Sequence, residues 1–242
     1  MTKYKFSVDG IPVAIYTLSE PEAVVEEMPQ AADEVAISVA FAPDTETDLR
    51  VEYFSKYRNE PREPHIPLAA LSCFLSRVRG YPDMTVELVY SGGIIKLTLD
   101  RMNDYNFTLK NEKCKILCTK NVDFLDGISQ ECSIINASYP YAILLCEDAE
   151  CFDEGRLDLL FDRLKQTGIT SLLILSFSEG LTVKTAGEIS PYRAVARAVS
   201  YLSYRGVAFP DGYATAYVDG RQCKILKTCA GITFYPEIKY IS

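Results

Sequence analysis

The feature that most constrains the fold of this chain is an internal repeat. Residues 67–99 and 191–226 both begin with proline and continue as an apolar stripe at helical spacing. An Arg-Gly pair ends each stripe, at Arg79-Gly80 and at Arg205-Gly206, as expected where a helix stops. Two β-rich runs follow in each segment. The repeat therefore predicts the same unit twice, a helix followed by a β-hairpin.

The order of elements also matches on either side of these two helices. Gly92-Gly93 and Asp219-Gly220 suit the tight turns of the two hairpins. Upstream of each helix the pattern predicts a strand, another helix and another hairpin. The predicted strands are 13–16, 34–41 and 49–54 in the first half and 141–146, 171–177 and 181–185 in the second, with helices opened by Ser19 and Asp153.

The repeat divides the chain into two modules of similar size. The segment 100–112 is polar and weakly periodic, so we interpret it as the linker between them. A length of 242 residues suits two units better than one or three. The predicted modules are residues 1–112 and residues 113–232, the second a structural repeat of the first.

Composition and charge narrow the class of protein. Hydrophobic residues make up 48% of the chain and charged residues 24%, which is enough apolar material for a sizeable core. A net charge of −8 disfavours nucleic acid as a partner, because phosphate binding needs a basic face. No apolar run approaches the length of a membrane span, and the polar start 1–5 lacks the apolar centre of a signal peptide. We therefore expect a cytoplasmic protein, with no membrane partner and with its eight cysteines as free thiols.

Three further stretches carry a family resemblance. Residues 48–54 and the following Ser55–Glu60 resemble a strand that ends in Phe-Asn-Ala-Asp-Gly-Ser-Glu, with Phe54 and Glu60 keeping their identities. Gly93-Ile94-Ile95 is similar to a strand pair after the first central helix, and Tyr139-Pro140-Tyr141 occupies the place of Asn-Pro-His. In order and spacing the chain resembles the diaminopimelate epimerase family over nearly its whole length.

The resemblance implies an α/β fold of the α+β type. It consists of two pseudo-symmetric domains, each a curved, mostly antiparallel sheet around a central helix whose N-terminus faces the inter-domain cleft. It also implies that the C-terminal strand, residues 233–241, crosses back to the first domain. The family inverts an α-carbon without a cofactor, using one cysteine to remove a proton and a second to return it.

Both cysteine positions are rewritten in this sequence. Alignment without gaps places His65 and Pro191 where the two cysteines belong, and a slip of one residue places Pro64 and Ser190 there. Cys73 lies two turns into its helix, where a core position is expected. The sequence therefore predicts that the two-cysteine reaction does not occur.

His65 is the sharpest catalytic candidate that remains. It is the only histidine in the chain, its ordinary pKa suits proton transfer near neutrality, and the resemblance places it at the start of the first central helix. The related phenazine-biosynthesis isomerases have a Gly-His-Pro turn at that point. Glu188 is the second candidate, since the resemblance aligns it with the glutamate of the family's Gly-Glu-Thr stretch. The alternative reading of His65 is a loop residue that flanks the helix start.

Five further residues are candidates for ligand binding, each with a structural alternative. Ser190 either caps its own helix or binds a ligand carboxylate. Four tyrosines either line the cleft or pack at an ordinary interface; they are Tyr57, Tyr139, Tyr141 and Tyr192.

Two functions remain open from the sequence. The first is a divergent, cofactor-independent isomerase or lyase, in which His65 and Glu188 act on a small carboxylate or amino-acid-like substrate in the inter-domain cleft. The alternative is a non-catalytic protein that keeps the scaffold to bind a small molecule or a partner. Neither hypothesis requires a metal or a cofactor, and a homodimer is compatible with both.

Overall fold

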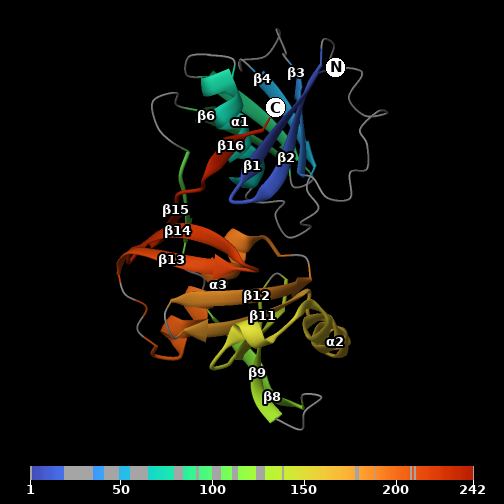
Figure 1. The fold of residues 1–242 in the computed structure, drawn as a ribbon, viewed down its shortest axis with the longest axis vertical. Helices are drawn as coiled ribbons and strands as arrows, with labels where there is room; N and C mark the ends of the chain where they lie inside the picture. The colour runs from blue at the N-terminus through green and yellow to red at the C-terminus, as the bar shows by residue number, and fades with distance from the viewer. Residues whose placement is uncertain are drawn as a thin grey trace. The chain divides into compact units, whose positions relative to one another are not determined.

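The computed structural model describes most of the chain in two compact units. The described residues are 2–18, 35–40, 49–54, 65–78, 84–90, 93–99, 105–110, 114–123, 129–137, 139–177, 180–187, 189–207, 209 and 211–241. Unit 1 comprises residues 1–106 and 235–242, and unit 2 comprises residues 107–234. Figure 1 shows the elements of both units.

In the residues that the structure describes, unit 1 is a sheet with one long helical segment. The sheet has the strand order β16-β1-β2-β3-β4-β5-β6. α1 (His65–Cys73) continues into η2 (Phe74–Val78), a stretch of π-helix. The strands are β1 (Thr2–Val8), β2 (Ile11–Leu18), β3 (Val35–Ala40), β4 (Leu49–Phe54), β5 (Met84–Tyr90), β6 (Gly93–Leu99) and β16 (Ile238–Tyr240).

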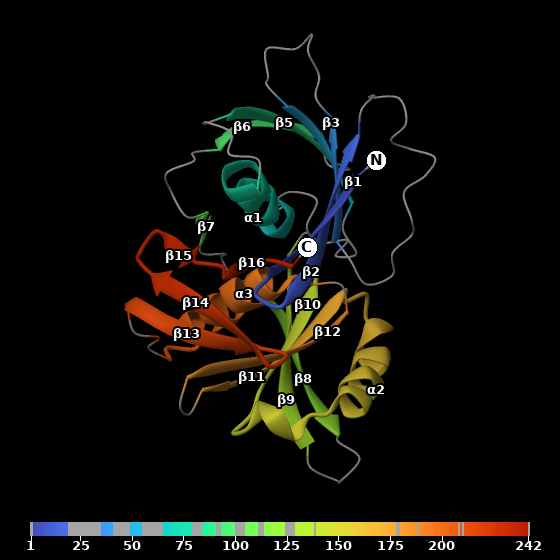
Figure 2. The same ribbon diagram turned by 45° about the horizontal axis from the view of Figure 1, so that its top comes forward.

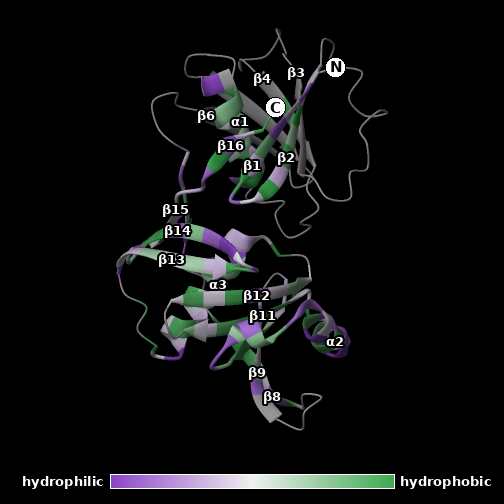
Figure 3. Cartoon of the chain, in the orientation of Figure 1, coloured by the Kyte–Doolittle hydropathy of each residue, from purple (hydrophilic) through white to green (hydrophobic). Residues whose placement is uncertain are grey.

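α1 is buried on all sides because its sequence is apolar all round. Every residue from Ile66 to Cys73 is buried, and α1 contacts β1, β2, β3 and β16. A helix without a polar face is stable only where it is enclosed. Figure 3 shows α1 largely in the hydrophobic colours, in contrast to the mixed colours of α2 in unit 2. α1 is thus the central helix of unit 1.

The described part of unit 2 is a larger sheet that carries two α-helices and one short 3₁₀-helix. Its strand order is β7-β15-β14-β13-β12-β11-β10-β9-β8. The helical elements are η3 (Ala149–Cys151), α2 (Glu154–Lys165) and α3 (Pro191–Tyr204). The strands are β7 (Phe107–Lys110), β8 (Ile116–Asp123), β9 (Ser129–Ile135), β10 (Tyr141–Leu145), β11 (Ser171–Phe177), β12 (Leu181–Gly187), β13 (Gly212–Val218), β14 (Arg221–Lys227) and β15 (Gly231–Phe234).

The two helices explain why the middle strand β11 is apolar at nearly every position. Leu172 and Ile174 join the apolar cluster that contains the buried leucines of α2, Leu157, Leu160 and Leu164. Leu173 and Leu175 are also fully buried, and β11 contacts α3 as well as α2. Because side chains alternate between the faces of a strand, both faces of β11 must be covered. Figure 2 shows α2 and α3 as separate helices beside this sheet.

The two units share one succession of strand pairings. From β1 to β6 the neighbouring pairs are antiparallel, parallel, antiparallel, parallel and antiparallel. From β9 to β14 the succession is the same. α1 connects β4 to β5, and α3 connects the corresponding strands β12 and β13. This is the arrangement that a repeated strand-helix-hairpin module would give.

The predicted hairpins and helix caps are confirmed where they fall on described residues. β3–β4, β5–β6, β11–β12 and β13–β14 are antiparallel hairpins. Asp219 and Gly220 have φ values of 47° and 76°, as a tight hairpin turn requires. Asp153 caps α2, its side chain accepting a hydrogen bond from the backbone N–H of Arg156. The helix predicted from Ser19 lies outside the described residues.

Two boundaries differ from the sequence prediction. α1 begins at His65, so Pro67 is the third helical residue and not the first. Proline is tolerated there because the first-turn N–H groups have no partner within the helix. The segment 100–112 is not wholly a linker, since β7 lies within it and pairs with β15. Alternate burial of Phe107 and Leu109 marks β7 as a strand, but four residues are too few to show a clear period.

The chain passes between the units at two places that lie side by side. Phe107 and Phe234 are the first and last residues of unit 2, and they are register partners in the β7–β15 pair. Beyond Phe234 the chain enters unit 1, where β16 pairs with β1. Among the described residues there is no helix long and apolar enough to cross a membrane.

Candidate functional site

The start of α1 places His65 beside Tyr105. His65 is the first residue of the helix, and its side chain is half-buried. Its Nδ1 atom lies 3.4 Å from the hydroxyl oxygen of Tyr105, while its Nε2 atom is out of contact with solvent. Both residues belong to unit 1. The flanking-residue reading and the catalytic reading of His65 are both compatible with this position.

The first turn of α1 is poor in backbone donors. Pro67 has no N–H group, so one of the donors that usually face an anion at a helix start is missing. Cys73 is buried further along the helix, and burial raises the pKa of its thiol. A thiol held in its protonated form is a poor base and a poor nucleophile. The structure thus places Cys73 in the core, as the sequence predicted.

The start of α3 is closed by a conventional cap. Ser190 is buried, and its hydroxyl oxygen accepts a hydrogen bond from the backbone N–H of Arg193 at 3.3 Å. Pro191 follows as the first helical residue and has no N–H. One donor of the first turn is therefore bonded to Ser190 and another is absent. Ser190 has the capping role that was one of its two predicted readings.

The strand that leads to α3 ends at a glycine with a restricted environment. Gly187 has a φ of 90°, which favours glycine. A Cβ at this position would collide with the carbonyl oxygen of Thr170 and the ring of Phe161. Glu188, the second catalytic candidate, follows immediately and lies outside the described residues.

Of the four candidate tyrosines, two lie in the interior of unit 2. Tyr192 is 1% exposed, and its ring packs edge-on against Phe107 and Phe234 at centroid distances of 5.0 and 5.1 Å. Tyr141 is also 1% exposed, and its ring lies under the guanidinium of Arg197. These two rings take part in internal packing.

The other two candidate tyrosines differ from this pair. Tyr139 is 36% exposed and could reach a ligand at the surface. Tyr57 lies outside the described residues. The sequence left packing and ligand binding open for all four rings, and only Tyr139 is seen on the surface of the described part of the chain.

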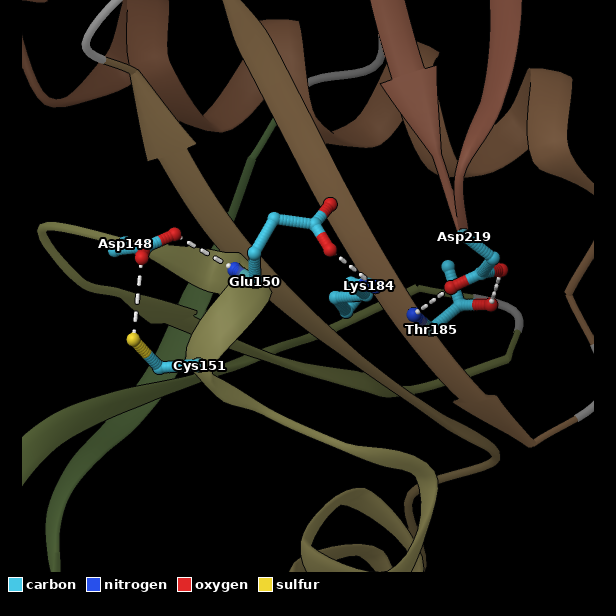
Figure 4. Close-up of polar contacts among 6 residues, drawn as sticks. All are labelled: Asp148, Glu150, Cys151, Lys184, Thr185 and Asp219. Atoms are coloured by element: carbon cyan, nitrogen blue, oxygen red, sulfur yellow. Dashed lines mark hydrogen bonds and ion pairs between the residues drawn. The ribbon is translucent and has the colours of Figure 1, made fainter.

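β12 carries two side chains that are committed to bonds within unit 2 (Figure 4). Nζ of Lys184 lies 2.7 Å from a carboxylate oxygen of Glu150 in η3. The backbone N–H and the hydroxyl of Thr185 both donate to the carboxylate of Asp219, at 2.8 and 2.7 Å. The polar groups of this segment thus bind η3 and the turn between β13 and β14.

The cysteines beside β10 are held as thiols. Cys151 donates to the Asp148 carboxylate at 3.1 Å, and this hydrogen bond raises the pKa of Cys151 and lowers that of Asp148 (Figure 4). Burial raises the pKa of Cys146 to about 11. Neither group is ionised near neutrality, so neither is an activated nucleophile. Within the described ranges no three His, Cys, Asp or Glu residues gather in a way that could hold a metal ion.

The sequence analysis did not identify two residues that contact candidate residues in the structure: Tyr105 contacts His65, and Arg197 contacts Tyr141. Tyr105 lay in the segment taken as a linker, and nothing local marks it as a neighbour of His65. Arg197 lies on α3 outside the apolar stripe of that helix, and it is 1% exposed. No local signal marked it, because arginine is mostly exposed in proteins and is rarely fully buried.

Comparison with known proteins finds solved structures with a similar fold. No protein-family model matches the chain, and no curated protein matches it by sequence. A phenazine biosynthesis PhzC/PhzF protein from Clostridium difficile has a TM-score of 0.61 at 9% identity, covering 99% of this chain and 96% of that chain. A PhzF-family phenazine biosynthesis protein from Enterococcus faecalis has a TM-score of 0.60 at 12% identity, covering 100% and 98%. A hydroxyproline epimerase from Agrobacterium vitis with bound trans-4-hydroxy-L-proline has a TM-score of 0.56 at 11% identity, covering 99% and 90%.

These neighbours define the class of fold. The chain is an α+β protein with the diaminopimelate epimerase-like fold, which confirms the predicted fold class. Its structural neighbours include PhzF-family phenazine biosynthesis proteins and a hydroxyproline epimerase. The prediction that the starts of α1 and α3 face one cleft stays a prediction.

Proposed function

We propose that this protein is a cofactor-independent isomerase that moves a proton within a small carboxylate-bearing substrate, with His65 at the reacting centre. The observation that carries the proposal is the position of the chain's only histidine at the first residue of the central helix α1. The fold supports it, because one of the structural neighbours is a hydroxyproline epimerase. That neighbour was solved with a small amino acid bound, which motivates the carboxylate as the substrate class.

The chemistry needs one group that removes a carbon-bound proton and one that stabilises the charge left behind. Imidazole titrates near pH 6.5 and can serve in either role at neutral pH. We propose Glu188 as its partner in this reaction, since a carboxylate is an effective base in a site that excludes water. Cysteine chemistry is not part of the proposal, because no cysteine begins α1 or α3.

Deuterium uptake tests this function directly. The protein is incubated in heavy water with a panel of amino and hydroxy acids that includes trans-4-hydroxy-L-proline, and each compound is monitored by mass and by proton NMR. We expect one class of compound to gain deuterium at a carbon. The His65→Ala variant should exchange it at least about 100-fold more slowly, the usual loss when an acid–base group is removed.

Two further variants sharpen this test. Glu188→Gln should lose exchange by a similar factor if the carboxylate is the base. Lys239→Ala is the matched control, since Lys239 lies on the surface with 64% of its side chain exposed, and it should exchange at the wild-type rate. Exchange by wild type that survives unchanged in His65→Ala would exclude His65 from the reacting centre.

A second candidate function is a non-catalytic binding or scaffold protein. Three features favour it: Pro67 and Pro191 remove first-turn donors, Ser190 is bonded within its own helix, and Nε2 of His65 is out of contact with solvent. Thermal shifts against a metabolite library, followed by mass analysis of the recovered ligand, separate the two functions. A ligand that stabilises the protein and is recovered unchanged supports binding. A ligand that is recovered as an isomer excludes the non-catalytic function.

A further inference from the structure

Tyr105 is the residue that the structure brings to the imidazole of His65. The two residues are 40 positions apart in the sequence, yet the phenol oxygen and Nδ1 are 3.4 Å apart. Both side chains are half-buried and both belong to unit 1. A contact between residues so distant in sequence is made by the fold and not by local chain geometry. This contact affects the chemistry of His65, because a hydrogen bond at one ring nitrogen determines which of the two nitrogens of the neutral ring carries the proton.

The direction of this hydrogen bond follows from the strengths of the two groups. A phenol ionises near pH ~10, whereas an imidazolium loses its proton near pH ~6.5. The neutral imidazole nitrogen is therefore a much stronger base than a neutral phenol oxygen, and the phenol is the more acidic donor. Of the two possible directions of this hydrogen bond, the favoured one has the Tyr105 O–H as donor and Nδ1 of His65 as acceptor.

We propose that Tyr105 is a positioning residue for His65, whose O–H donates to Nδ1, fixes the ring orientation and holds the proton of the neutral imidazole on Nε2. The inference rests on the proposed function for its catalytic meaning. A fixed tautomer gives the imidazole one defined donor nitrogen for the negative charge that develops as the substrate carbon loses its proton. Nε2 is out of contact with solvent in this structure, so a substrate reaches it only when the groups that cover it move. In this role His65 stabilises the charge, and a separate base removes the proton.

The tautomer can be measured without any turnover. His65 is the only histidine, so protein labelled with ¹⁵N-histidine gives one pair of ring nitrogen signals. The spectrum is recorded at about pH 8.5, two units above the ordinary histidine pKa, so that the ring is neutral. We expect wild type to show a protonated Nε2 and an unprotonated, hydrogen-bonded Nδ1. In Tyr105→Phe the tautomer ratio should shift toward the Nδ1–H form by about five-fold, the effect of losing one ordinary hydrogen bond.

Tyr240→Phe is the matched control, because Tyr240 belongs to unit 1 and is 50% exposed. It should leave both nitrogen shifts unchanged. Circular dichroism establishes that each variant is folded, and the wild-type tautomer is informative even where a variant is not. A wild-type spectrum with the proton on Nδ1 would overturn the proposal. So would a folded Tyr105→Phe variant with the wild-type tautomer ratio.

Kinetics then separate this inference from the proposed function. With an exchanging substrate, Tyr105→Phe should lower kcat by about five-fold with little change in KM, since the donor is disordered and not removed. The expected spectra without deuterium exchange in any compound would leave the positioning role intact and end the catalytic function. Exchange that depends on His65, together with a wild-type tautomer ratio in Tyr105→Phe, would support the catalytic function and exclude the positioning role of Tyr105.

Discussion

At the scale of single residues, the most unusual feature of unit 2 is a buried arginine. Arg197 is 1% exposed, and its guanidinium carbon lies 4.1 Å from the centroid of the Tyr141 ring. Desolvation of a charge is costly, and the face of an aromatic ring offsets part of that cost more effectively in an interior than in water. Ser133 and Tyr201 form a second polar contact in the interior, with their hydroxyls 3.0 Å apart. The interior of unit 2 therefore contains specific polar geometry as well as apolar packing.

A double-mutant cycle should reveal the coupling between Arg197 and Tyr141. Tyr141→Leu should lower the free energy of unfolding by about 2–4 kcal/mol, because it removes ring packing and one partner of a buried cation. In the Arg197→Met background the same change should cost about 2 kcal/mol less, since no buried charge is left without its ring. Urea unfolding of the four proteins measures both values. Additive effects would mean that the ring and the guanidinium do not stabilise one another.

At the scale of elements, Asp219 extends the contact between two parallel strands. The β12–β13 register ends at the pair Val183 and Val218, one residue before the turn. Beyond it the Asp219 backbone N–H donates to the carbonyl of Val183, and its carboxylate accepts from both donors of Thr185. The turn thus ties β13 and β14 to the strand that leads into α3. Since β12 ends at Gly187 and α3 begins at Pro191 after its N-cap Ser190, this turn helps to fix the start of the helix.

Replacement of Asp219 should weaken this connection. Asp219→Ala should lower the free energy of unfolding by about 1–2 kcal/mol, because it removes two charge-assisted hydrogen bonds at a partly solvated position and places alanine at a positive φ. Asp219→Asn should cost less than half as much, since asparagine tolerates this backbone conformation and keeps one acceptor oxygen. Chemical denaturation compares the two. Equal losses in both variants would show that the carboxylate contributes nothing that an amide cannot.

At the scale of the whole molecule, unit 1 is built from both ends of the chain. β16 pairs with β1, and the ring of Tyr240 packs 5.3 Å from that of Phe6. Two further bonds join Asp9 and Glu237. Unit 2, by contrast, is continuous from Phe107 to Phe234. The last eight residues therefore stabilise the unit in which the chain began.

Removal of the C-terminal segment should affect unit 1 selectively. A chain that ends at Phe234 loses β16, so β1 becomes an unpaired edge and its apolar face loses Tyr240. Hydrogen exchange should accelerate at least about ten-fold in β1 and β2, while β10 and β11 keep their protection, because exchange reports local stability. A matched Tyr240→Ala variant should show a smaller effect of the same kind. Equal acceleration in both units would show that they unfold together.

Much of the fold could be predicted because it depends on local patterns. The hairpins follow from β-rich runs and turn residues such as Asp219-Gly220, and the caps Asp153 and Ser190 act on backbone groups three residues away. The prediction was weaker where elements are short or atypical. β7 has only four residues, and α1 starts two residues before the proline that was taken as its first residue.

The sequence by itself determined the helix and hairpins of the repeated unit, because side-chain periodicity and turn chemistry act over a few residues, and its resemblance to a known family indicated the fold class. Only the tertiary structure decided that Tyr105 meets His65 and that Arg197 lies on Tyr141. The first contact joins residues 40 positions apart and the second joins residues 56 positions apart, so both depend on the path of the chain through its unit. Side-chain periodicity specifies which face of an element is buried, but tertiary packing determines which residues contact that face.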